Sequence, residues 1–130
     1  MTLSITTSYA ESWRYNIMVT LAMLNSRGEQ VGYHSAEESP LPVGSQSSEA
    51  PEGFVRRREI KIEFEQCDKV RFYIYVLPNS LPEDTTLAGV ETTFPLQVKL
   101  TDSSGETILS EKLAVNRFGG CGKEYIKELN

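Results

Sequence analysis

The stretch WRYNIMVTLAML, residues 13–24, decides the fold of this chain. Every odd position from 13 to 23 carries a large apolar or aromatic side chain, whereas Arg14, Asn16 and Thr20 interrupt the even positions. A β-strand turns successive side chains to opposite faces, so a repeat of two indicates a strand with one face in a hydrophobic core. We therefore predict a half-buried strand over 13–24.

The same repeat of two recurs along the rest of the chain. It is carried by Ile60, Ile62 and Phe64, by Val70, Phe72, Ile74 and Val76, and by Phe94, Leu96, Val98 and Leu100. Turn residues and weaker alternation predict further strands, so that strands are expected at 3–8, 30–34, 54–65, 69–77, 94–101 and 106–115. Residues 123–130 fit either a short C-terminal helix or a last strand, because Tyr125 and Leu129 are four apart.

These segments predict an all-β fold. Seven to eight short antiparallel strands with wet outer faces favour a two-sheet β-sandwich, and a closed barrel is the alternative. A length of 130 residues fits a single domain over 1–130. Two long loops are expected, at 35–53 and 78–93. The first is rich in Ser, Pro and Gly and reads as mobile or as ordered by a partner, and the second can cross between the sheets.

Charge excludes several classes of partner. The net charge of −5 argues against nucleic-acid binding. The basic run 56–58 is followed at once by Glu59, so it is interpreted as a solvated face rather than a phosphate-binding patch. The longest nearly apolar run, 17–24, is too short to span a membrane. Without a visible export signal the chain is expected to be cytoplasmic, and export stays open if it was cut from a precursor.

Reactive side chains are few. His34 is the only histidine, and no hydrolase, P-loop or dinucleotide-binding motif is present, so no enzyme activity is expected. Only three aspartates occur, Asp68, Asp84 and Asp102, and two of them are expected to cap turns rather than to bind calcium. No metal or cofactor is therefore predicted. Cys67 and Cys121 can pair once or stay free, and free thiols suit a reducing compartment.

One set of side chains suggests a binding surface. Arg71, Tyr73 and Tyr75 alternate with the apolar stripe of their strand and point to its other face. Tyrosine rings beside an arginine form a flat platform suited to a protein or a sugar, and Trp13 or Tyr33 could extend it. The competing interpretation is a central strand covered on both faces, and exposed strand edges offer a route to a partner by strand addition.

The sequence thus favours a non-catalytic module for protein interaction or assembly, with a protein partner or self-association. The alternative is a carbohydrate- or ligand-binding β-sandwich of an exported protein. No motif resembles that of a particular family, and a sandwich fold by itself carries no function.

Overall fold

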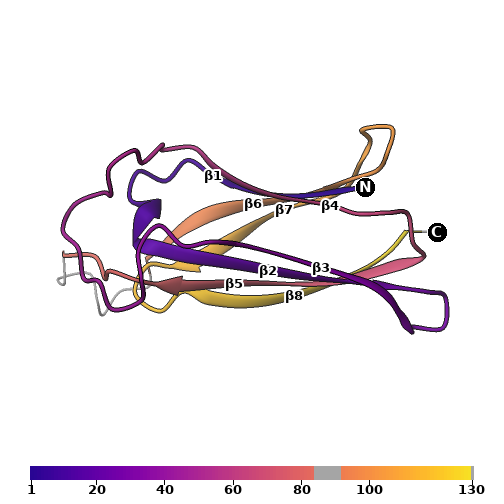
Figure 1. The fold of residues 1–130 in the computed structure, drawn as a ribbon. Coiled ribbons are helices and arrows are strands. Elements are labelled where there is room, and N and C mark those ends of the chain that lie inside the picture. Colours follow the sequence, from indigo (N-terminus) through magenta and orange to yellow (C-terminus); the bar gives the residue numbers. More distant parts are fainter. Residues whose placement is uncertain (84–91, 130) are drawn as a thin grey trace.

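The described part of the chain forms eight β-strands and one short 3-10 helix. The computed structural model describes residues 1–83 and 92–129 (Figure 1). In chain order the elements are β1 (Thr2–Thr7), η1 (Ser12–Arg14), β2 (Tyr15–Leu24), β3 (Gln30–Glu38), β4 (Arg58–Glu63), β5 (Lys69–Pro78), β6 (Thr93–Thr101), β7 (Thr107–Asn116) and β8 (Cys121–Glu128).

The strands lie in two antiparallel sheets of four, which confirms the predicted β-sandwich. Sheet A has the order β4-β1-β6-β7 and sheet B the order β3-β2-β5-β8. Figure 1 shows them as two layers, with the N- and C-terminal ends at the same end of the sandwich. The chain changes sheet between β5 and β6, as predicted for the 78–93 connection. Residues 84–91 of that connection lie outside the described part. Each sheet ends in two edge strands, so the alternative of a closed barrel is wrong.

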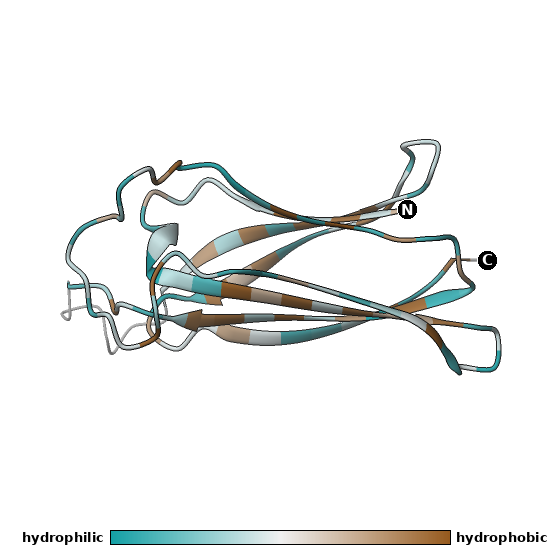
Figure 2. Cartoon of the chain, in the orientation of Figure 1, coloured by the Kyte–Doolittle hydropathy of each residue, from teal (hydrophilic) through white to brown (hydrophobic). Residues whose placement is uncertain are grey.

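The core is built by the repeat of two seen in the sequence. Ile5 of β1 lies between Ile60 of β4 and Val98 of β6, while Val19 of β2 lies opposite Ile74 of β5. All five side chains are buried. Burying one such side chain contributes roughly 1.5–3 kcal/mol. Figure 2 shows hydrophobic positions recurring along the strands of both layers.

The C-terminal segment is a strand, and the helical alternative for 123–130 is wrong. Tyr125 of β8 pairs with Phe72 of β5, and their rings stack with centroids 4.9 Å apart. Lys123 and Lys127 occupy the same side of β8 as Tyr125. These two lysines interrupt the apolar repeat, which is why the strand was hard to recognise in the sequence.

Charged side chains flank the side of the sandwich where β7 and β8 are the edge strands. Glu111 of β7 pairs with the buried Val98 and so points to the inner side of its sheet. Lys123 and Lys127 of β8 likewise point to the inner side of sheet B. Burial, with Glu111 nearby, raises the pKa of Tyr125. Inward-pointing charges on edge strands are a known protection against pairing with another chain.

Strand β3 is longer than predicted and β4 is shorter. Residues 35–38 pair with 17–20 of β2, so the first four residues of the expected 35–53 loop belong to β3. Ser35 and Glu37 of this part face solvent and Ala36 packs against the core, an alternation too polar to be recognised in the sequence. The described connection between β3 and β4 therefore covers 39–57.

The basic run 56–58 is not wholly a solvated face. Arg56 and Arg57 are exposed, but Arg58 is buried at the start of β4. Its Nε donates to Glu38 Oε1 at 2.7 Å, and its Nη1 donates to the carbonyl oxygens of Ser12 and Tyr15. Arg58 thus ties sheet A to β3 and β2 of sheet B, which a run of three like charges could not indicate.

Candidate binding face on sheet B

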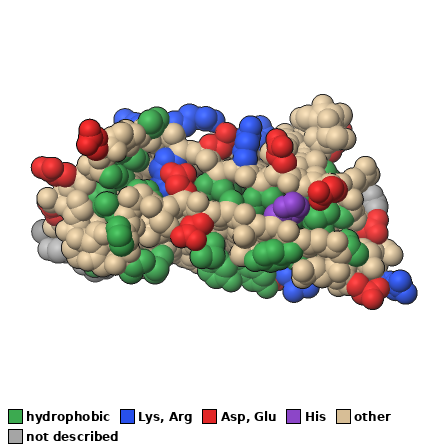
Figure 3. Space-filling model, in the orientation of Figure 1, with side chains coloured by type: hydrophobic (Ala, Val, Ile, Leu, Met, Phe, Trp, Pro, Cys, Tyr) green, Lys and Arg blue, Asp and Glu red, His purple; other side chains and the backbone are tan. Residues whose placement is uncertain are grey.

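Exposed large apolar side chains are concentrated on one of the two sheets. Six of those in the described residues lie on strands of sheet B: Met18, Val31, Tyr33, Tyr75, Leu77 and Ile126. Each exposes between 43% and 60% of its surface. The other three, Val43, Val55 and Leu81, lie in loops, and no strand of sheet A contributes one. In Figure 3 hydrophobic side chains gather along the lower margin, below the purple histidine, where sheet B lies in this view.

The strand register places most of these residues on one surface. Its outward-facing side chains form three rows across β3, β2, β5 and β8: Tyr33–Ala22–Arg71–Ile126, Ser35–Thr20–Tyr73–Glu124 and Glu37–Met18–Tyr75–Gly122. Leu77 follows Tyr75 on β5, opposite Asn16. We call this surface the B face. Glu37 and Glu124 lie on the edge strands at the ends of their rows, while Met18, Arg71, Tyr73 and Tyr75 lie on the central strands β2 and β5.

The predicted platform residues lie on the B face. Strand β5 is central, since it pairs with both β2 and β8, but its outer side is not covered. The interpretation that β5 is covered on both faces is therefore wrong. The rings of Tyr73 and Tyr75 are 5.9 Å apart and nearly parallel, at 11°. Trp13 does not join them, because it is buried in η1, whereas Tyr33 does.

Charged neighbours influence the titration of Tyr73. Hydrogen bonding to the Glu124 carboxylate raises the pKa of Tyr73, and Arg71 opposes this shift. The Tyr75 ring lies beside Gly122, its pairing partner on β8. A Cβ added to Gly122 would lie 3.6 Å from this ring. The lack of a side chain at Gly122 thus leaves the ring space to lie against the neighbouring strand.

A groove lies at the end of the B face nearest η1. It has a volume of about 400 Å³. Its walls come from β2, β3, β5 and the 39–57 loop: Asn16, Ile17, Met18, Glu37, Ser39, Val43, Tyr75 and Leu77. Sequence reasoning missed Met18, Val43 and Leu77. Met18 and Leu77 left a signal in the sequence, because each is an apolar residue on the outward-facing side of a strand whose other side already supplies the core.

Hydrogen bonds link the 39–57 loop to the segments beside this groove. Asn16 Nδ2 donates to the Leu41 carbonyl at 2.9 Å, and Asn16 Oδ1 accepts from Asn79 Nδ2 at 2.9 Å. The Gln46 amide donates to the Asn79 carbonyl at 3.1 Å, with Gln46 at a φ of 47°. These partners come from β2 and from the segment after β5, so composition of the loop alone could not reveal them.

A buried arginine anchors the same loop at a second point. Arg14 Nη1 donates to the carbonyl oxygens of Ser47 and Leu81, at 3.2 and 3.0 Å. Its Nε pairs with Glu11 at 2.8 Å, and its guanidinium lies 4.4 Å from the centre of the Trp13 ring. Trp13 and Arg14 are therefore structural, and Arg14 holds the loop that borders the groove.

The other chemically reactive residues are not gathered into a site. His34 lies on β3 with its Nε2 3.4 Å from Glu65 Oε2, on the side where β3 meets β4. Cys67 and Cys121 are free, and burial raises the pKa of each thiol. Within residues 1–83 and 92–129 there is no group of three or more side chains that could hold a metal ion.

Asp102 has a structural role in the turn between β6 and β7. Asp102 Oδ1 accepts hydrogen bonds from the Ser104 and Glu106 amides and from the Ser104 hydroxyl, at 2.6–3.0 Å. These bonds, that of the hydroxyl foremost, lower the pKa of Asp102. The predicted turn cap is thus confirmed at Asp102, and Asp84 lies outside the described residues.

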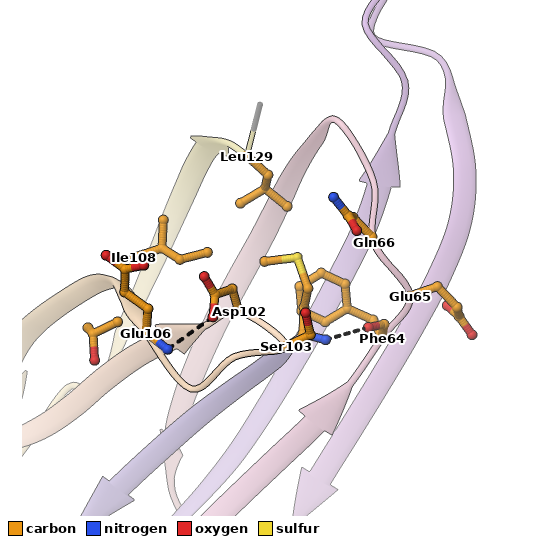
Figure 4. Close-up of a pocket in the computed structure, with 10 residues that line it drawn as sticks. Phe64, Glu65, Gln66, Asp102, Ser103, Glu106, Ile108 and Leu129 are labelled. Atoms are coloured by element: carbon orange, nitrogen blue, oxygen red, sulfur yellow. Dashed lines mark hydrogen bonds between the residues drawn. The ribbon is translucent and has the colours of Figure 1, made fainter.

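A second cavity, of about 460 Å³, opens at the opposite end of the sandwich. Figure 4 shows Phe64, Ile108 and Leu129 around it, carried by separate segments, while Glu65 points away. Two hydrogen bonds join residues of the lining to each other, since the Glu106 amide donates to Asp102 and the Met1 amino group donates to the Phe64 carbonyl. The cavity therefore offers a mixed lining without a converging set of reactive groups.

Comparisons with known proteins leave the B face as the main guide to function. The part of the chain that is described contains no helix long and apolar enough to cross a membrane. Searches of protein-family models, curated proteins and solved structures give no significant match to this chain.

Proposed function

We propose that this protein is a non-catalytic interaction module that binds another protein through the B face. The observation that carries the proposal is the asymmetry between the sheets, because all the exposed large apolar side chains on the described strands belong to sheet B. Contiguous apolar surface on one side of a small domain marks an interaction site more often than scattered exposure does.

The dimensions of the B face suit a protein partner. Four strands spaced about 4.8 Å apart and about ten residues long, at about 3.3 Å per residue, span roughly 600 Å². A standard protein interface buries about 800 Å² on each partner. Aromatic residues, Met and Arg are enriched in such interfaces, and Tyr33, Tyr75, Met18 and Arg71 supply these types here.

Two further observations support a module without catalysis in a reducing compartment such as the cytoplasm. The single histidine contacts an exposed glutamate rather than a nucleophile. Both cysteines are free, and cysteines outside reducing compartments are commonly oxidised.

The second candidate is a carbohydrate ligand on the same face. It is favoured by the near-parallel rings of Tyr73 and Tyr75, which resemble the flat surfaces on which sugar rings stack. Trp13 cannot contribute to such a sugar-binding surface, because it is buried. A glycan array that gives a response removed by Tyr75→Ser would favour this candidate over a protein partner.

The decisive experiment compares two pairs of exposed apolar residues. Tyr75→Ser with Leu77→Ser removes two side chains from the B face, whereas Val55→Ser with Leu81→Ser removes two from loops outside it. The three proteins are immobilised and used to capture partners by crosslinking in extracts of the cells that produce the chain. We expect a protein retained by the wild type and the loop variant and lost with the B-face variant. Equal capture by all three proteins would contradict the proposal.

A further inference from the structure

We infer that the groove on the B face is the anchor pocket of the interface, and that it receives an apolar side chain of the partner next to a lysine or arginine held by Glu37. This inference rests on the proposed function, because it specifies what the partner presents to the B face.

The lining of the groove calls for an apolar occupant. Met18, Tyr75 and Leu77 form its floor on β2 and β5, and Val43 of the loop stands at its side. Its volume of about 400 Å³ lies within the ~300–1,000 Å³ of typical ligand pockets. Protein interfaces concentrate their binding energy in side chains that fill such pockets.

One charge on the groove lacks a cationic partner. Glu37 is exposed and lines the groove, and its Oε1 accepts a hydrogen bond from the Ser39 hydroxyl at 2.7 Å. No Lys, Arg or His of the described residues lies within ion-pair distance of it, and residues 84–91 contain none of these types. Its neighbour Glu38 is paired with Arg58. An unpaired carboxylate beside an apolar groove favours a partner with a complementary cation.

The groove is held in shape before any partner binds. Leu41 is fixed by Asn16, and the turn that carries Val43 is closed by bonds from Ser45 to the Pro42 carbonyl, at 3.2 Å from the amide and 2.5 Å from the hydroxyl. A preformed pocket avoids much of the entropic cost of ordering a loop on binding.

The test uses small probes that carry the two chemical features separately and together. Amide resonances of ¹⁵N-labelled protein are followed during titration with n-hexylammonium, with n-hexanoate as the matched anion and ethylammonium as the cation without an apolar chain. We expect saturable shifts at Met18, Tyr75 and Leu77 with n-hexylammonium, and binding about fivefold weaker with n-hexanoate, the limit of an exposed ion pair. Ethylammonium should give no saturable shift at these residues.

Two variants test which residues of the groove recognise the cation and the apolar chain of the probe. Glu37→Gln should make n-hexylammonium and n-hexanoate bind alike, and Val43→Ser should weaken both. Val55→Ser is the matched control, since it removes an equally exposed loop valine away from the groove. Equal binding of cation and anion to the wild type, shifts centred elsewhere, or no saturation would overturn the inference.

The outcomes separate this inference from the proposed function. Partner capture that depends on Tyr75 and Leu77, with no preference for n-hexylammonium, would keep the binding face and remove the anchor pocket. Binding of n-hexylammonium without any captured protein would mark a small-molecule site and overturn the partner anchor. Groove shifts that appear on raising the protein concentration alone would make a second copy of the chain the occupant, and would also overturn it.

Discussion

The two sheets bury their inner faces by the same rule but differ in what they turn outward. The outer side of sheet A is built from hydroxyl, amide and charged residues, such as Ser4 of β1, Lys61 of β4, and Gln97 and Lys99 of β6. The outer side of sheet B carries Met18, Tyr75 and Ile126 among its residues. Folding explains the inner faces of both sheets, because both must exclude water. It does not explain why only the outer face of sheet B exposes large apolar side chains, so this difference is where a function is to be sought.

The largest expected effect tests whether the inner and outer sides of β5 have separate roles. Phe72 is fully buried and Tyr73, the next residue, lies on the B face. Phe72→Ala should lower the free energy of unfolding by about 3–5 kcal/mol, because it leaves a cavity in the core. Tyr73→Ala should cost no more than about 1 kcal/mol. Urea unfolding followed by circular dichroism measures both, and similar losses would mean that the B face is part of the fold rather than a free surface.

A smaller effect is expected from two glycines near the start of β8. Gly120 has a φ of +72°, and a Cβ there would lie 2.0 Å from the Val76 carbonyl oxygen. Gly120→Ala should therefore cost at least about 2 kcal/mol. Gly122 faces Tyr75 at an ordinary contact distance, so Gly122→Ala should change stability by less than about 1 kcal/mol. Thermal unfolding measures the loss of stability in both variants. A loss for Gly122→Ala as large as that for Gly120→Ala would show that the B face does not tolerate an added methyl group.

The smallest effect concerns the pKa of Tyr73 on the B face. Glu124 raises the pKa of Tyr73, so Glu124→Gln should lower that pKa toward the ordinary tyrosine value of about 10. A raised pKa in the folded state means that this contact stabilises the fold fully below the unfolded pKa and is lost as pH rises through the folded pKa. Ultraviolet titration of the variant, with Tyr73→Phe to identify the signal, measures the shift. An unchanged titration would show that Glu124 does not contact the phenol in solution.

The sequence predicts the sandwich where polar and apolar residues alternate cleanly, as in β4 around Ile60. It fails where the inward side of a strand carries charge, as at Lys123 and Lys127, or where a strand is polar on both sides, as at 35–38. The platform of Arg71, Tyr73 and Tyr75 follows from the same alternation. The groove does not, because Val43 reaches it through hydrogen bonds between segments far apart in the sequence.

The charges at Glu111, Lys123 and Lys127 affect the tendency of the protein to aggregate at high concentration. An intruding strand that docked beside β7 or β8 would have to strip water from these groups without neutralising them. Fibre growth along that margin is therefore penalised. The charges guard the edge formed by β7 and β8, whereas the exposed apolar side chains lie on the broad outer side of sheet B.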